Sequence, residues 1–229
     1  MENLENVIQD KVESKLKQRV VLLNGPPNTG KDVSADMLKD LFGTGAHKAF
    51  KDVLYEETAK YFGVETGWIR SMATDRTTKE SPTRRLFDKD LNWIVRLALT
   101  LLSFVRPVGF SPRQALIHVS ENIIKPRFGK KYFGHKLLDA IKESGEEYTF
   151  VSDSGFIEEI HPLVEAGLEV IVLRLKRDGC TYTGDSRRYL TDEELEDLGV
   201  KVIDIDNNGT LEDLKSKLLN ASLEILGVK

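Results

Sequence analysis

The sequence predicts a three-layer α/β fold, in which helices cover both faces of a mostly parallel sheet of five strands. Strand-like and helix-like segments alternate along most of the chain, which is the pattern of a parallel sheet with helical crossovers. A buried first strand leads through a glycine-rich loop into an amphipathic helix. The chain has 229 residues, of which 40% are hydrophobic, enough for one large domain or two small ones.

The glycine-rich loop follows a predicted strand over residues 19–24 and precedes a helix that begins near Lys31. Gly25, Gly30 and Lys31 have the Walker A spacing G-x-x-x-x-G-K. Such a loop directs backbone N–H groups at a polyphosphate, and its lysine reaches the β and γ oxygens. Asp32 stands where a Ser or Thr hydroxyl usually binds Mg²⁺. The alternative is a chance turn, but the strand before and the helix after favour a phosphate-binding loop.

The segment 63–90 differs from the short strand near 46–50 and the helix to Phe62 that precede it, because it shows little periodicity. A solvated loop and an anion-binding insert are both consistent with it. Five of its seven prominent charged residues are cationic in an acidic protein, which favours the insert. These residues are Arg70, Asp75, Arg76, Lys79, Glu80, Arg84 and Arg85.

An apolar helix is predicted over residues 91–105. It is too short to span a bilayer and contains Asn92 and Arg96. We expect it to be buried within the monomer, and a homodimer interface is the alternative.

Ser111 and Pro112 then mark the N-terminus of another helix, with Arg113 and Gln114 in its first turn. A cation opposes the helix dipole there, which indicates either a function or tolerance at the surface. A further helix is predicted over about 131–142.

Asp153 ends a short apolar strand predicted over residues 148–153. In a protein with a Walker A loop, an acidic residue at this place suggests the Walker B role of supporting Mg²⁺ directly or through water. An ordinary turn aspartate is the alternative, because Asp153-Ser154-Gly155 is turn-like. The two motifs together favour the metal role.

A helix over about 157–166 and a buried strand over about 169–175 precede a basic segment with two short glycine turns. Arginines on a closing lid can neutralise a transferring phosphoryl group, whereas a solvated basic loop would have no such role. The cations are Arg174, Lys176, Arg177, Arg187 and Arg188.

Two capping boxes organise the C-terminal part. Thr191 with Glu194 starts a short helix, and Thr210 with Asp213 starts the final one. The last strand is predicted between them, over residues 202–206. The final helix is expected to face the core with Leu211, Leu214, Leu218, Ala221 and Ile225.

Composition limits the partners and the compartment. The net charge of −4 argues against stable nucleic-acid binding and against an anionic membrane. One cysteine, Cys180, excludes an intrachain disulfide and fits a reducing cytoplasm. The first residues lack an apolar signal region. The four histidines have no metal-ligand spacing, so we expect no zinc site.

The order of these motifs resembles the deoxynucleoside monophosphate kinases of tailed phages, within the P-loop nucleoside monophosphate kinase superfamily. The resemblance covers residue 19 to the C-terminus and leaves residues 1–18 as a helical extension. The elements that carry it are Gly30-Lys31-Asp32, Lys48-Ala49-Phe50-Lys51, the Asp-Arg-x-x-Lys-Glu-x-Pro element at 75–82, Ser111-Pro112-Arg113-Gln114, Asp153 with Phe156 and Glu159, the lid and the Asn-x-Gly turn at 207–209.

The resemblance implies a P-loop NTPase fold over residues 19–229, with a helical acceptor-binding insert at about 50–130 and a lid at about 175–190. It implies ATP-dependent phosphorylation of a mononucleotide, with ATP and Mg²⁺ as cofactors. The expected compartment is the cytoplasm, which is the host's if the chain is phage-encoded. The sequence does not predict the preferred base, the sugar or the oligomeric state.

The resemblance also implies roles for individual residues. Residues for ATP are Gly25, Asn28, Thr29, Gly30, Lys31, Asp32 and Arg177. Asp32 and Asp153 would organise Mg²⁺, partly through water. Acceptor-binding candidates are Lys51, Arg76, Lys79, Glu80, Arg113 and Gln114. Catalytic candidates are Lys31, Asp32, Asp153, Arg187 and Arg188.

One position departs from the family pattern, because Gly155 stands where the family has an arginine. Arg174, Arg177 or a lid arginine could replace it, the substrate could differ, or the chain could be an inactive, nucleotide-binding relative. Animal-type phosphomevalonate kinases have a similar Gly-Lys-Asp loop and lid, so a small-metabolite phosphate kinase is the enzymatic alternative. A nucleic-acid-dependent ATPase is disfavoured by the acidic composition.

Overall fold

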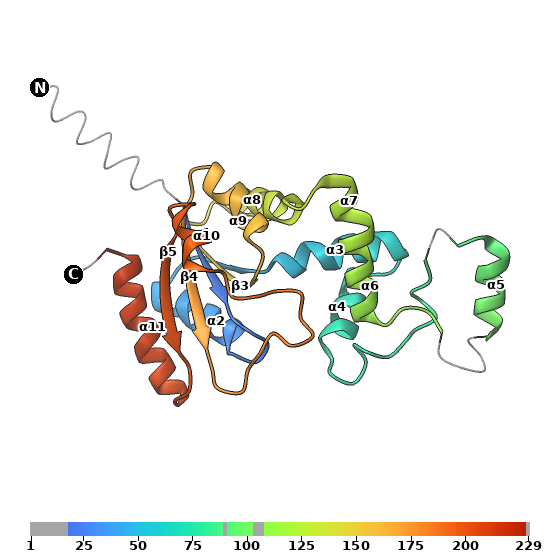
Figure 1. Cartoon of the computed structure of the whole chain (residues 1–229), viewed down its shortest axis with the longest axis horizontal. Helices are drawn as coiled ribbons and strands as arrows, with labels where there is room; N and C mark the ends of the chain where they lie inside the picture. Colours follow the sequence, from blue (N-terminus) through green and yellow to red (C-terminus); the bar gives the residue numbers. More distant parts are fainter. Residues whose placement is uncertain (1–17, 89–90, 103–107, 228–229) are drawn as a thin grey trace, which may run out of the picture. The chain divides into compact units, whose positions relative to one another are not determined.

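The computed structural model describes residues 18–88, 91–102 and 108–227 (Figure 1). The chain divides into two compact units. The core unit contains the described residues of Met1–Phe50 and Phe133–Lys229, and the insert unit is Lys51–Tyr132. The predicted N-terminal extension lies outside the described residues except for Gln18.

A five-stranded sheet forms the centre of the core unit. Its strands are β1 (Arg19–Asn24), β2 (Ala46–Lys48), β3 (Tyr148–Ser154), β4 (Glu169–Lys176) and β5 (Lys201–Asp206). They are ordered β2-β3-β1-β4-β5, and each neighbouring pair is parallel. The central strand β1 is apolar on both faces, as a strand covered by helices on both sides must be. The predicted α/β fold with a parallel five-stranded sheet is confirmed.

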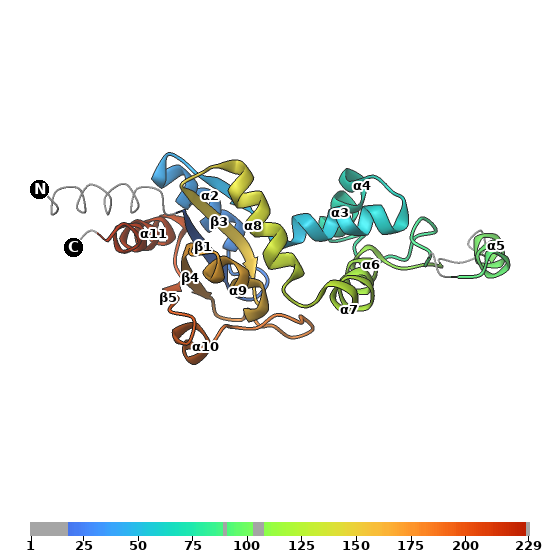
Figure 2. The same ribbon diagram turned by 90° about the horizontal axis from the view of Figure 1, so that it is seen from above.

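Helices cover both faces of this sheet (Figures 1 and 2). Helices α2 (Lys31–Phe42) and α11 (Leu211–Ile225) contact each other and bury Leu38, Leu214 and Leu218 against one face. Helices α8 (Tyr132–Ser144) and α9 (Ile157–Glu165) lie on the other face. These two approach so closely that a Cβ on Gly134 would lie 2.4 Å from the carbonyl oxygen of Glu159. The short helix α10 (Asp192–Glu196) contacts β5.

Leu211 is exposed, so its predicted place in the core is wrong. The other four predicted core positions, Leu214, Leu218, Ala221 and Ile225, are buried as expected. Leu211 lies in the first turn, where the capping box of Thr210 and Asp213 holds the start of the helix at the surface.

The strand order points to a ligand-binding position at the carboxyl end of β1. The chain leaves β1 through α2 to reach β2 at one edge of the sheet, whereas it leaves β3 through α9 to reach β4 on the opposite side of β1. Ligands of open α/β sheets bind at the carboxyl ends of the strands where the order reverses in this way. The glycine-rich loop leaves β1 at that edge.

The insert unit is helical. Its elements are α3 (Phe50–Phe62, from its second residue), α4 (Thr66–Thr74), α5 (Trp93–Leu102), α6 (Pro112–His118), a π-helical turn (Val119–Ile124) and α7 (Lys125–Phe128). Its small core contains Tyr55, Ile69, Leu86 and Ala115. Helix α4 lies in the segment predicted to be irregular. Helix α4 buries Ile69 in this core, but it has only nine residues and gives too short a helical period to stand out in the sequence.

The apolar helix α5 is largely exposed, so the prediction that it is buried in the monomer is wrong. The core of the insert unit is filled by side chains from α3, α4, α6 and Leu86 instead. Residues 103–105 of the predicted helix lie outside the described residues. Within the described ranges, no helix combines the length and apolar character needed to cross a membrane.

Candidate phosphate-binding site

The loop between β1 and α2 has the backbone shape of an anion-binding nest. Asn28 and Gly30 have positive φ angles of 69° and 92°. A Cβ on Gly30 would lie 2.8 Å from Nδ2 of Asn207, and one on Gly25 would lie 2.7 Å from the carbonyl oxygen of Leu175. Only glycine fits these two positions without a shift. The N-terminus of α2 follows directly, so backbone N–H groups and the helix dipole are available to an anion.

Lys31 is buried at the base of this loop. Its Nζ donates hydrogen bonds of 2.7 Å to the carbonyl oxygens of Gly25 and Pro26. Burial and, to a smaller extent, the charge of Arg187 lower the pKa of Lys31 to about 8, against the opposing effect of Asp32 and Asp153. The site therefore holds a lysine whose charge is only partly compensated by its surroundings and is available to phosphate oxygens.

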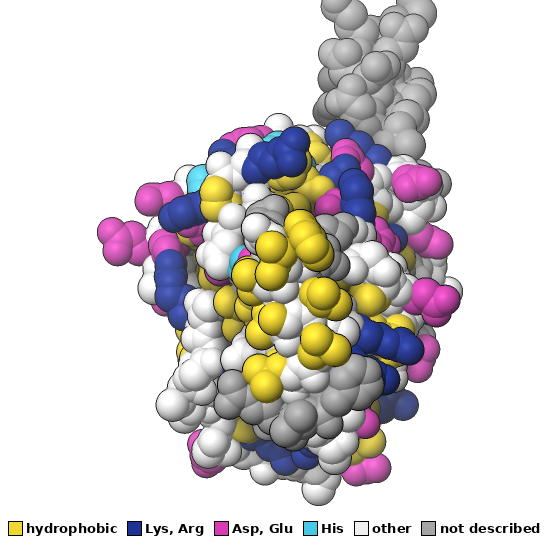
Figure 3. Space-filling view, turned by 90° about the vertical axis from the view of Figure 1, so that its right-hand side faces the viewer, with side chains coloured by type: hydrophobic (Ala, Val, Ile, Leu, Met, Phe, Trp, Pro, Cys, Tyr) yellow, Lys and Arg dark blue, Asp and Glu magenta, His cyan; other side chains and the backbone are white. Residues whose placement is uncertain are grey.

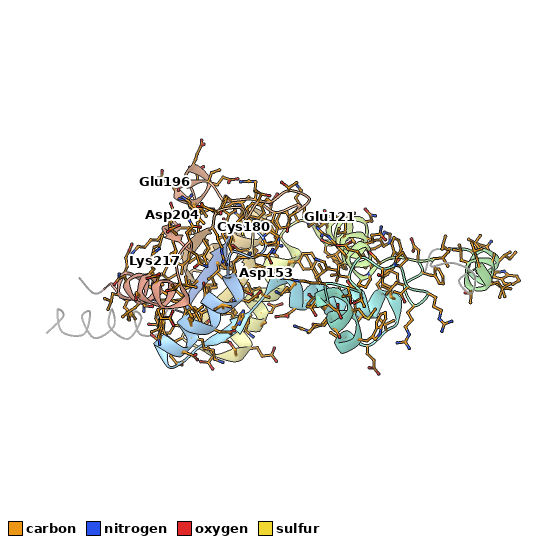
Figure 4. All side chains as sticks on the ribbon, turned by 90° about the horizontal axis from the view of Figure 1, so that it is seen from below. Glu121, Asp153, Cys180, Glu196, Asp204 and Lys217 are labelled. Carbon is orange, nitrogen blue, oxygen red and sulfur yellow. The ribbon has the colours of Figure 1, made fainter. Side chains whose placement is uncertain are left out.

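Two carboxylates lie beside the loop. Asp32 is in the first turn of α2, and its Oδ1 accepts a hydrogen bond of 2.7 Å from Ser152. Asp153 is buried near the carboxyl end of β3 (Figure 4), and its Oδ1 accepts a hydrogen bond of 2.8 Å from the backbone N–H of Phe50. Helix α2 and strand β3 contact each other, so both acidic groups lie at the carboxyl ends of the strands.

These carboxylates fit a magnesium ion that is shared with a phosphate ligand. Mg²⁺ is commonly held by one or two carboxylates, several waters and substrate phosphates, not by a cage made of protein groups alone. Among the described residues, no group of three or more His, Cys, Asp or Glu side chains could hold a metal. Asp32 and Asp153 are the donors that such a shared ion would use.

Arg187 takes the space beside Gly155. A Cβ on Gly155 would lie 2.5 Å from Cβ, 2.8 Å from Cγ and 3.1 Å from Cδ of Arg187. Asp185 holds the guanidinium through bonds from Nε and Nη2 of 3.0 and 2.7 Å. Burial alone would lower the pKa of Arg187, but Asp185 and Asp153 outweigh it and raise the pKa. Among the arginines considered as replacements at residue 155, Arg187 is therefore the one that lies against Gly155.

The other predicted cations of the lid segment differ in position. Arg177 reaches the loop, where its Nη1 lies 3.4 Å from the carbonyl oxygen of Asn28. Arg188 pairs with both carboxylate oxygens of Glu194, in the capping box of α10, and this pairing lowers the pKa of Glu194 to about 2. Arg174 pairs with Asp204 and Asp192. Arg177 is thus at the loop and Arg187 lies beside Gly155, whereas Arg188 and Arg174 are paired with carboxylates elsewhere.

Three residues that hold this site together were not predicted from the sequence as part of it. The buried amide of Asn24 donates to Tyr182 and to the carbonyl of Arg188, and it accepts from the N–H of Leu190. Burial raises the pKa of Tyr182, whose hydroxyl also accepts from the N–H of Gly25. Asn207 donates a bond of 2.8 Å to the carbonyl of Thr29. A polar residue at the end of an apolar strand was the available signal for Asn24.

The acceptor candidates all belong to the insert unit. Arg113 forms an ion pair of 3.2 Å with Glu80, and its backbone N–H donates to the carbonyl of Lys79. The side chain of Gln114 accepts from the N–H of Ser111 in a capping box. The structure therefore brings the 79–80 turn and the start of α6 together. The two remaining candidates lie elsewhere in the unit, Lys51 in the first turn of α3 and Arg76 in the turns after α4.

Comparison with known proteins gives no family. No family model matches the chain, and no curated protein matches it. A sugar kinase from Janibacter sp. HTCC2649 is 13% identical with a TM-score of 0.40, over 93% of this chain and 95% of that one. A Thermus thermophilus protein is 18% identical with a TM-score of 0.42, over 92% and 98% of the two chains. Both likenesses are too weak to assign a function.

The contact between residues 155 and 187 predicts that substitutions at these two positions have non-additive effects on the free energy of unfolding. Gly155→Ala forces a Cβ against the stem of Arg187 and should cost about 1–3 kcal/mol of unfolding free energy. In an Arg187→Gly background the same change should cost little. Urea unfolding of the four proteins gives the coupling energy.

Gly67→Ala is the matched control, because nothing lies within 4 Å of its Cβ position and α4 should gain helix propensity. A coupling energy within about 0.3 kcal/mol of zero would contradict the contact.

Proposed function

We propose that this chain is an ATP-dependent phosphotransferase that transfers a phosphoryl group to a (deoxy)nucleoside monophosphate. The observation that carries the proposal is the arrangement at the carboxyl edge of the sheet. There a Walker A loop, a buried lysine, two carboxylates and a lid arginine surround one position. Such a set is suited to a metal-bound polyphosphate.

Each group of this set has a role in the proposed reaction. The N–H groups of the loop bind the β and γ phosphates, and Lys31 compensates the charge that they carry. Arg187 would compensate the charge on the transferring group. Its charge lowers the pKa of Lys31, and the charge of Asp153 raises the pKa of Arg187, so the three groups lie near one another. Asp32 and Asp153 would hold Mg²⁺, which neutralises phosphate oxygens when it is bound. Transfer then depends on positioning and charge, not on covalent catalysis.

The proposed acceptor is a mononucleotide, and the basic residues of the insert unit support this. Lys51, Arg76, Lys79 and Arg113 are candidates for its phosphate in a chain with a net charge of −4. Glu80 is held by Arg113, so it is a candidate for an acceptor's base or sugar hydroxyls near that phosphate. Gln114 keeps its predicted role in base or sugar recognition, alongside its bond to Ser111.

An acceptor screen tests the activity. Purified protein is given ATP and Mg²⁺ with each of the four deoxynucleoside monophosphates, the ribonucleoside monophosphates and phosphomevalonate, and ADP release is coupled to NADH oxidation. We expect turnover with at least one mononucleotide. Lys31→Ala should lower kcat/KM by about 100-fold or more, because the main phosphate-directed cation is lost. Lys39→Ala, an exposed lysine of the same helix, should have no effect.

The other outcomes separate the alternatives. Turnover of phosphomevalonate alone would identify a small-metabolite kinase. ATP binding by calorimetry without transfer to any acceptor would identify a non-catalytic relative. Equal activity of the wild-type and Lys31→Ala proteins would contradict the proposed site.

The lowered pKa of Lys31 predicts a pH-dependent affinity for ATP. Protonated Lys31 binds phosphate, and its pKa of about 8 means that the free protein loses this proton as the pH rises through about 8. Above that value binding must take up a proton, so the affinity should fall by up to about tenfold per pH unit. Titration calorimetry in buffers of different ionisation enthalpy measures both the affinity for ATP and the number of protons taken up on binding.

Lys31→Arg is the control for this experiment, because a guanidinium stays charged over the whole range and should flatten the profile. A wild-type affinity that is constant from about pH 7 to 9.5, with no proton uptake, would show that Lys31 keeps an ordinary pKa.

A further inference from the structure

Helix α5 of the insert unit carries an outward apolar stripe. Its members are Trp93, Ile94, Leu97 and Leu101, which are 72%, 57%, 53% and 61% exposed. Their spacing of i, i+1, i+4 and i+8 places them within about 100° of the helix circumference. Figure 3 shows hydrophobic side chains gathered on this face of the molecule. Monomeric proteins rarely expose a contiguous apolar surface of this kind without a use for it.

Leu99 lies on another side of α5 and is less exposed than the stripe. Leu99 lines an open pocket of about 630 Å³ together with Phe110, Ile117 and His118. The helix therefore contacts this pocket of the insert unit through Leu99, away from the stripe. The outward stripe is a second apolar side, and the small core of the unit does not use it.

The low charge of α5 indicates which kind of partner its apolar stripe would bind. Arg96 is the only charged residue between Trp93 and Leu102, in a chain of which 31% is charged. A helix that lies on a lipid surface needs a strongly charged, basic polar face, which α5 lacks. A partner with a charged surface would lose its hydration without gaining an ion pair. A second copy of the same stripe brings no opposing charge.

The area is sufficient for a small symmetric interface. The exposed parts of the four side chains amount to roughly 500 Å² per copy, so two copies would bury on the order of 1,000 Å². That value is at the lower limit for a specific interface. Leu97 is at the middle of the ridge Trp93, Leu97, Leu101, and such i, i+4 ridges pack into the grooves of a facing helix. We propose that two copies of this chain associate through α5 about a two-fold axis.

The mass in solution tests this proposal. Sedimentation velocity or light scattering on the full chain should give twice the 25.9 kDa of one chain, with dissociation on dilution because the interface is small. Leu97→Glu places two carboxylates at the centre of the interface and should give the mass of a single chain. Leu219→Glu on α11, at a leucine that is 49% exposed, is the matched control and should remain dimeric. Circular dichroism checks that both variants are folded.

A cross-link tests the symmetry and does not depend on the charge substitution. In a Cys180→Ser background, Leu97→Cys should form a disulfide-linked dimer on mild oxidation, whereas Leu219→Cys should not. A wild-type protein of single-chain mass at all concentrations would overturn the proposal. So would a dimer that survives Leu97→Glu. A monomer that sediments with phosphatidylcholine–phosphatidylserine vesicles would assign the stripe to lipid instead.

Discussion

The buried ammonium of Lys31 is the constraint on which the candidate site depends. A buried charge is costly unless nearby groups compensate it. Here two loop carbonyls accept its hydrogen bonds, and the carboxylates of Asp32 and Asp153 oppose the lowering of its pKa by burial. The loop can keep this shape only because glycine stands at 25 and 30. Asn207 and Tyr182 then fix the loop to the last strand and to the lid segment.

The side chain of Arg187 fills the space that a side chain at residue 155 would occupy. This contact extends the constraint to the lid segment. A side chain at 155 would exclude the stem of Arg187, so the absence of a side chain at Gly155 and the position of this partly buried arginine depend on each other. The neighbouring Arg188 has the same chemistry but a different surrounding, because Glu194 and the start of α10 hold it. Adjacent arginines can therefore have unrelated roles, and their sequence positions alone do not separate them.

Local rules explain what the sequence predicted well. The strand at 19–24, the helix from Lys31, the capping boxes and the glycine loop are set by nearest neighbours and by one-dimensional periodicity. Helix α4 was missed because its nine residues give too short an apolar period to stand out in the sequence. The exposure of α5 was mispredicted because apolar character indicates that a surface needs a partner, but not which one. The contacts of Asn24 and the pairing of Arg187 with Gly155 join residues far apart in the chain, so no local pattern contains them.

The charge balance at the loop explains why a metal ion would accompany a polyphosphate there. The charge of Arg187 is partly compensated by Asp185, Arg177 reaches the loop at Asn28, and the carboxylates of Asp32 and Asp153 act on Lys31. A bare triphosphate would meet the two carboxylates as well as these cations, and the repulsion by the carboxylates would offset part of what the cations and the loop N–H groups provide. A hard divalent cation reverses this relation, because the same carboxylates then bind it. On this reasoning Asp32, which first stands out as the absence of a hydroxyl, makes phosphate binding depend on the metal more strongly than a Ser or Thr would.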